Sequence, residues 1–147
     1  MHTRKTYGPA QIYKSLLRFV GDLADAAPHP LIYHAWDSRN DEAELPRADI
    51  IGISGWTYND DQALLSVDMG VTLSTIDDIN LMREVDLIDY CWANAGSGME
   101  IPVRDVLTGQ DINKLAVTEF RIVPSGQSVI RNYRTMALSM LLTAPAA

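Results

Sequence analysis

The sequence contains a single cysteine, Cys91, and this alone excludes an intrachain disulfide. No apolar run approaches the roughly 20 residues that span a bilayer, and the N-terminal segment lacks the apolar core of a secretory signal. Basic residues are also scarce, with 12 Lys and Arg against 19 Asp and Glu and a net charge of −7. Because a grip on phosphate backbones needs clustered Lys and Arg, nucleic-acid binding is disfavoured. These absences indicate a soluble protein made in a reducing compartment, the cytosol.

The composition is that of a folded protein. Hydrophobic residues make up 47% and charged residues 21% of the 147 positions, which is enough to bury a core in one domain. We therefore expect residues 1–147 to form a single domain, with 1–7 and 144–147 as flexible tails.

Helical spacing predicts two helices. The first covers 9–26, with Pro9 in its first turn and an apolar stripe of Ile12, Leu16, Phe19 or Val20, and Leu23. The second covers 77–95, with Asp77 and Asp78 capping its start and Gly96 as the glycine that ends it. Its predicted buried stripe consists of Leu81, Met82, Val85, Ile88, Cys91 and Trp92.

Alternating and β-branched segments predict strands at 31–37, 50–58, 63–75, 114–124 and 132–143, with a further short strand at 100–104. A polar loop is expected at 38–49 and a hairpin connection at 125–131. The resulting order, α-β-β-β-α-β-β, favours an α+β fold in which helices pack on one face of a mostly antiparallel sheet.

None of the reactive residues stands in a pattern typical of catalysis. Segment 52–56, "GISGW", has the wrong spacing for a nucleophile elbow and indicates a bulge. His34 and Asp37 fall on opposite faces of their strand, and Asp60, Asp61 and Asp68 lack the spacing of a calcium loop. Cys91 is expected to be a core thiol. We therefore expect a protein that is not an enzyme and has no cofactor and no metal.

Two strands are unusual for a plain monomer. In 65–75 the apolar residues alternate with a row of small and polar residues. This polar row faces either a lumen or an intersubunit boundary, or else ordinary solvent. Its candidate residues are Ser66, Asp68, Thr72 and Ser74, with Asp60 and Asp61 beside them. The closing strand is apolar on both sides, and its candidate intersubunit row is Thr135, Ala137, Ser139 and Leu141. A curled sheet covering that row is the alternative.

From residue 8 to 143, the order of elements resembles the tail terminator (head–tail joining or neck) proteins of tailed bacteriophages. The similar features are the N-terminal helix, "LIYHAWDS", "ADIIGISGW", and the long strand "ALLSVDMGVTLST" running directly into "DINLMREVDLIDYCWANA". Two closing strands, "LAVTEFRIVP" and "YRTMALSMLLT", complete the pattern.

The resemblance implies a homo-oligomeric ring, commonly a hexamer, that caps the tail tube and joins it to the neck or connector proteins. Such a protein belongs to the virion and assembles in the host cytoplasm, with no membrane partner. DNA crosses the lumen without specific binding. Six copies at −7 carry about −42, and a negative lumen repels phosphate.

Two alternatives remain open. One is another structural protein of the neck, connector or sheath end. The other is a small-molecule-binding or hydrolase-like domain that would use His34 with Asp60, Asp61 and Asp68.

Overall fold

The computed structural model describes residues 8–34, 48–60, 64–76, 82–105, 107–128 and 133–145. Its elements are α1 (Pro9–Asp25), β1 (Ile32–Tyr33), β2 (Ile50–Asp60), β3 (Leu64–Ile76), α2 (Met82–Ala95), β4 (Glu100–Arg104), β5 (Asp111–Ser128) and β6 (Tyr133–Pro145). The expected α+β order is confirmed, and the short strand predicted at 100–104 is β4.

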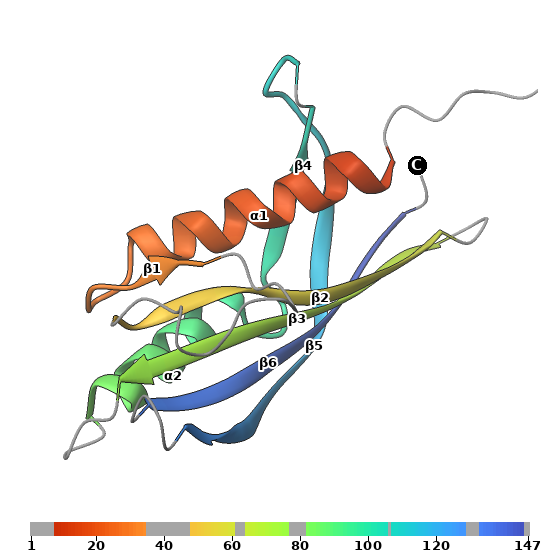
Figure 1. Cartoon of the computed structure of the whole chain (residues 1–147). Helices are drawn as coiled ribbons and strands as arrows, with labels where there is room; N and C mark the ends of the chain where they lie inside the picture. The colour runs from red at the N-terminus through yellow and green to blue at the C-terminus, as the bar shows by residue number, and fades with distance from the viewer. Residues whose placement is uncertain are drawn as a thin grey trace, which may run out of the picture.

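The strands form one six-stranded sheet in the order β1-β2-β3-β6-β5-β4 (Figure 1). β1 pairs with β2 in parallel, and every other neighbouring pair is antiparallel. The last strand of the chain, β6, therefore lies inside the sheet between β3 and β5. Neither described helix has the length and hydrophobicity needed to cross a bilayer.

The core lies on one face of this sheet. Along β3 the predicted alternation is confirmed, because its apolar residues Leu65, Val67, Met69, Val71 and Leu73 are all fully buried. They belong to a single cluster that also contains apolar residues of α1, α2, β4 and β5. Both helices thus cover the same face, and we call the opposite face of the sheet the outer face.

Helix α1 contacts both ends of the strand order. It lies against β1 and β2 on one side and against β4 on the other, so the sheet curls around the helix (Figure 1). Its predicted stripe is confirmed, with Ile12, Leu16 and Val20 fully buried. The ring of Tyr13 stacks on Trp56 of β2 with 4.9 Å between centroids.

Helix α2 is rotated about its axis relative to the prediction. The fully buried residues are Leu87, Cys91 and Ala95, one turn apart, whereas Val85 is 53% and Trp92 61% exposed. The predicted burial of Val85 and Trp92 was therefore wrong. Small side chains at 91 and 95 let the helix approach the core on that side.

A hydrogen bond fixes this rotation. The hydroxyl of Tyr90 donates to the carbonyl oxygen of Leu23 at the end of α1, with 2.6 Å between the oxygens. Of the predicted stripe, Ile88 packs partly buried against the core. The side chain of Met82, and Leu81 with the expected caps Asp77 and Asp78, lie outside the described residues.

The end of α2 also differs from the prediction. The left-handed residue is Gly98, with φ at 92°, and not Gly96. The amide of Gly96 donates to the carbonyl oxygen of Trp92 at 2.9 Å, and a Cβ at position 96 would collide with that same oxygen. Glycine is needed there for close approach rather than for a left-handed backbone.

The closing strands are longer than predicted. β5 continues to Ser128, through part of the expected connection at 125–131. β6 continues to Pro145, where its backbone still pairs with Leu64, so 144–145 belong to the sheet and not to a tail. Backbone pairing along a long ladder outweighs the local Gly and Ser turn signals. Residues 1–7, 35–47 and 146–147 lie outside the described part.

Candidate assembly surface

Around the middle of β2 and β3, the outer face is built from small and polar residues. Paired positions on two antiparallel strands share a face, and the register pairs Thr57 with Asp68, Asn59 with Ser66, and Gly55 with Gly70. The row that the sequence predicted as polar along β3 therefore continues onto β2. No large apolar side chain interrupts these three pairs.

Exposure divides this face into two parts. Thr57, Asn59 and Asp68 are exposed, and Ser66 and Thr72 are half-buried. At the other end, Ser74 is 3% exposed, and Ile50, its partner across the strands, is 1% exposed. The exposed part thus lies around Asp68, and Ser74 does not contribute to it.

The register brings the two candidate rows together. On β6, Leu141 pairs with Asp68, Ser139 with Gly70, Ala137 with Thr72, and Thr135 with Ser74. The candidate residues of β3 and β6 therefore occupy one face of adjacent strands, although they are about 65 positions apart in the sequence. Periodicity alone does not reveal this, because it does not say which strands are neighbours.

The same register separates the acidic candidates. Asp60 pairs with Leu65, in the row that belongs to the core face, whereas Asp68 is in the outer row. Asp60 and Asp68 thus do not share a face, and Asp61 lies outside the described residues. Of the predicted acidic set, Asp68 is the one whose side chain the structure describes, and it is exposed on the outer face.

Further along the outer face, β5 adds a charge pair. Glu119 is the register partner of Leu141 and Arg121 that of Ser139. The guanidinium of Arg121 binds the carboxylate of Glu119 through Nη2 at 2.9 Å and Nε at 3.2 Å. Because these two charges neutralise each other, Asp68 contributes the net charge of this part of the face.

The residues that the sequence analysis weighed as nucleophiles or metal ligands lie in ordinary parts of the fold. Ser54 lies in a β-bulge, because the register of β2 shifts between Ile53 and Gly55, as predicted for "GISGW". Cys91 is fully buried, and burial raises the pKa of its thiol to about 12. His34 follows β1, where its backbone amide donates to the carbonyl oxygen of Ile51; Asp37 lies outside the described residues. Among the described residues, no His, Cys, Asp and Glu side chains are grouped to hold a metal ion.

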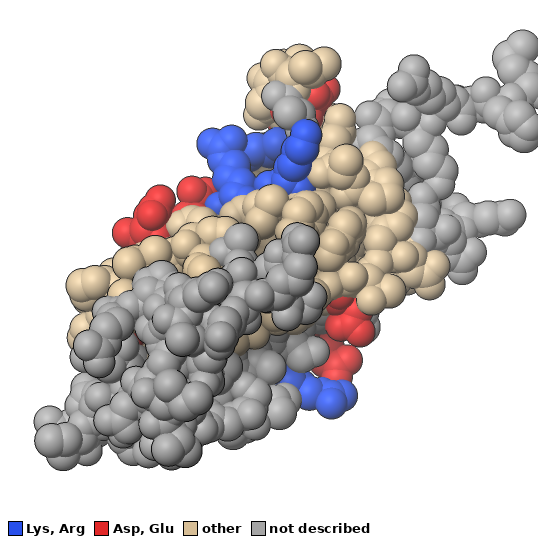
Figure 2. Space-filling model, viewed as in Figure 1, with Lys and Arg blue, Asp and Glu red and all other residues tan. Residues whose placement is uncertain are grey.

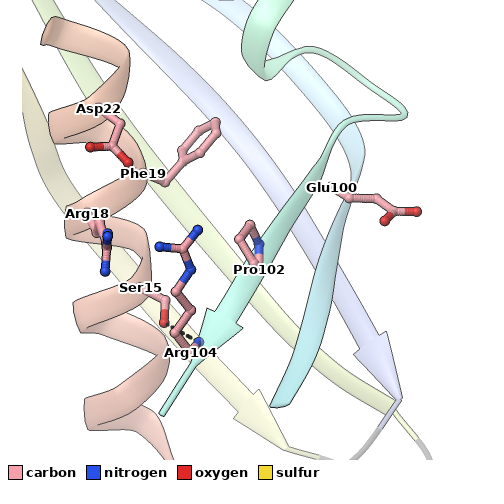
Figure 3. A pocket seen from close by; sticks show the side chains of 7 residues that line it. All are labelled: Ser15, Arg18, Phe19, Asp22, Glu100, Pro102 and Arg104. Carbon is pink, nitrogen blue, oxygen red and sulfur yellow. Dashed lines mark hydrogen bonds between the residues drawn. The ribbon is translucent and has the colours of Figure 1, made fainter. Parts of the chain in front are cut away.

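A pocket that the sequence did not indicate lies between α1 and β4. It has a volume of about 180 Å³, and its lining residues are Ser15, Arg18, Phe19, Asp22, Glu100, Pro102 and Arg104 (Figure 3). An adjoining pocket towards the β4–β5 turn shares Ser15, Arg18 and Arg104 and adds Lys14. Figure 2 shows Lys and Arg side chains gathered over this part of the molecule.

Ser15 holds the two walls of this pocket together. Its hydroxyl donates to the carbonyl oxygen of Gln11 at 2.8 Å and accepts the backbone N–H of Arg104 at 3.1 Å (Figure 3). The hydroxyl is thus engaged in two structural hydrogen bonds. Arg104 also pairs with Asp111, with 3.3 Å between Nε and the carboxylate oxygen.

Lys14 and Arg18 are the cations on the α1 side of the pocket. Within the described part of the chain, neither Lys14 nor Arg18 makes an ion pair. They are four residues apart on α1 and both exposed, so they present two charges on the same side of the helix. The lining of the pocket itself combines two arginines with two acids, Asp22 and Glu100, so the positive charge available on the α1 side comes from Lys14 and Arg18.

Comparison with known proteins supplies no family for this fold and these surfaces. No protein-family model matches the sequence, and no curated protein is similar to it.

Proposed function

We propose that this chain is a non-enzymatic structural protein of a tailed bacteriophage, which forms a ring that caps the tail tube and joins it to the neck. The observation that carries this proposal is the outer face of β2, β3 and β6. Small and polar residues line up there on β2 and β3, next to the β6 positions of the candidate row, with Asp68 as an exposed charge on β3.

Such a face suits a surface along which DNA moves. Small side chains allow close approach, and a carboxylate repels phosphate, so the polymer passes without binding. The same row next to a neighbouring subunit would permit tight packing, which makes an intersubunit boundary the second use of this face. In either case the α+β order agrees with the one expected of tail terminators.

Replacing Asp68 tests the role of the face. Asp68→Lys reverses one exposed charge and leaves the core untouched, so the melting temperature of the purified protein should stay within a few degrees of the wild type. Particles assembled with this variant should show lower yield, altered tail length or reduced infectivity. Electron microscopy of tails and plaque counts measure these effects.

Asp25→Lys is the matched control. It makes the same change of charge at an exposed position at the end of α1, away from the outer face. Normal particles with both variants would refute a role for the outer face. An equal loss with both would indicate sensitivity to total charge instead.

A further inference from the structure

The exposed side of α2 combines two large apolar residues with an acid. Val85, Asp89 and Trp92 are spaced by four and three residues, so they lie on one side of the helix. Trp92 is 61% and Val85 53% exposed, and Asp89 is exposed between them. Single exposed apolar residues are common, but a tryptophan with an apolar neighbour on one helix side is typical of a protein–protein contact.

The pocket between α1 and β4 offers matching chemistry. Phe19 and Pro102 give it apolar walls, the guanidinium group of Arg104 lies between α1 and β4, and Arg18, Asp22 and Glu100 also line it (Figure 3). Its volume of about 180 Å³ is below the ~300 Å³ at which small-molecule sites usually begin. A site of this size suits one large side chain better than a whole ligand.

Asp89 on α2 is complementary in charge to the cations beside the pocket, whose lining also includes Asp22 and Glu100. Indole rings attract guanidinium groups through the ring face, so Arg18 and Arg104 favour a tryptophan in the pocket. The carboxylate of Asp89, one turn from Trp92, can then pair with Lys14 or Arg18, which have no carboxylate partner among the described residues. No Lys or Arg follows in the last turn of α2 to oppose this pairing.

Trp92 does not fill the pocket of its own chain. The side chain of Trp92 is not part of the lining of its own pocket, and its exposure shows that it has no enclosing contact in the monomer. Two copies of the chain together supply both halves of the contact, because Trp92 comes from one copy and the pocket from the other.

We propose that Trp92 of one copy inserts into the Arg18–Arg104 pocket of a second copy, with Asp89 paired to Lys14 or Arg18. The inference rests on the proposed function in that it names the contact between subunits of the ring. Because the two surfaces differ, each copy can insert its Trp92 into one neighbour and hold the Trp92 of the other neighbour in its own pocket. Such a head-to-tail contact forms a closed ring when the rotation from one copy to the next adds up to a full turn.

Disulfide trapping tests the contact directly. Ala93→Cys places a thiol next to Trp92, and Asp22→Cys places one at the pocket rim; both positions are exposed. Native Cys91 is fully buried and does not interfere. At high protein concentration, a mixture of the two variants should form mixed disulfide dimers under mild oxidation.

The matched control is a mixture of Asp22→Cys with Glu119→Cys, whose thiol lies on the outer face. It should give only background cross-linking. Adding Trp92→Ala to the Ala93→Cys chain should weaken association by roughly 30-fold or more, the loss typical of a truncated hot-spot residue. Leu64→Ala, which removes another exposed apolar side chain, should leave cross-linking unchanged.

The outcomes separate this inference from the proposed function. Cross-linking at the level of the control, or cross-linking that is insensitive to Trp92→Ala, overturns the contact. Tails that assemble normally with Trp92→Ala also overturn it while the ring function stands. Specific cross-linking in a protein that never joins phage tails would support the contact and refute the function.

Discussion

Cys91 shows how burial changes a reactive residue. Its side chain is fully buried on the core side of α2, where a thiolate would lose its hydration. Burial therefore raises the pKa of the thiol from 9.0 to about 12. The thiol is protonated at neutral pH, and its contribution is to packing.

This shift predicts an alkaline loss of stability. Below pH 9.0 the thiol is protonated in the folded and unfolded states, so its contribution to stability is complete. At higher pH only the unfolded thiol ionises, and the free energy of unfolding should fall by about 1.4 kcal/mol per pH unit until the folded pKa is reached. Urea unfolding between about pH 8 and about pH 11 measures this slope.

Cys91→Ala provides the comparison. It should be less stable at neutral pH because it leaves a small cavity, but its alkaline slope should be shallower. Part of the slope should remain, since burial also raises the pKa of Tyr33 and Tyr90. Equal slopes in the two proteins would show that Cys91 ionises freely in the folded state.

Val71 tests which side of β3 faces the core. Its side chain is fully buried, so Val71→Asp places an unpaired carboxylate in the core and should cost more than about 3 kcal/mol of folding free energy. Thermal unfolding checks this. Asn59→Asp, at an exposed position of β2, should change stability by less than about 0.5 kcal/mol. A soluble Val71→Asp protein with the wild-type melting temperature would show that the strand is placed inside out.

At the scale of elements, the joint between α1 and β4 depends on one side chain. Ser15 is 8% exposed and accepts the backbone N–H of Arg104. Without this acceptor, the amide at the end of an edge strand would be left unpaired in a half-buried place. The hydroxyl thus connects the N-terminal helix to a strand 89 positions away.

Ser15→Ala should therefore destabilise the fold by about 1–2 kcal/mol, the usual cost of leaving a buried donor unsatisfied. Chemical denaturation measures the change, and amide hydrogen exchange at Arg104 should become faster. Ser54→Ala removes an exposed hydroxyl at the β2 bulge and should be neutral within about 0.5 kcal/mol. If both serines behave alike, the Ser15 bond contributes nothing to the joint.

The rotation of α2 marks the limit of what an amphipathic pattern can predict. Two overlapping stripes are present in its sequence: one through Val85, Ile88 and Trp92, and one through Leu87, Cys91 and Ala95. The first is more hydrophobic by residue type, yet the second is buried. The choice depends on how closely the helix can approach the core and on the Tyr90–Leu23 hydrogen bond, and both involve residues far apart in the sequence.

At the scale of the whole molecule, the curled sheet separates two surfaces with different chemistry. The outer face is small and polar at the described positions of β2 and β3 around the exposed Asp68, and it lies opposite the core cluster that both helices join. The pocket lies on the other side, where α1 contacts β4. The proposed ring assigns one surface to neighbouring subunits and the other to a lumen, and the Asp68→Lys and Trp92→Ala variants test these two proposals one at a time.

Local patterns in the sequence were sufficient for the class of the fold and most of its elements. Pro9 and the Ile12–Leu16–Val20 spacing determine α1, and unbroken alternation determines which residues of β3 are buried, because both depend on neighbours a few positions apart. Tertiary structure alone decided that β6 lies beside β3, that α2 exposes Trp92, and that Arg18 and Arg104 share a pocket. These features come from contacts between distant segments, whose free energies depend on shape and register and not on local periodicity.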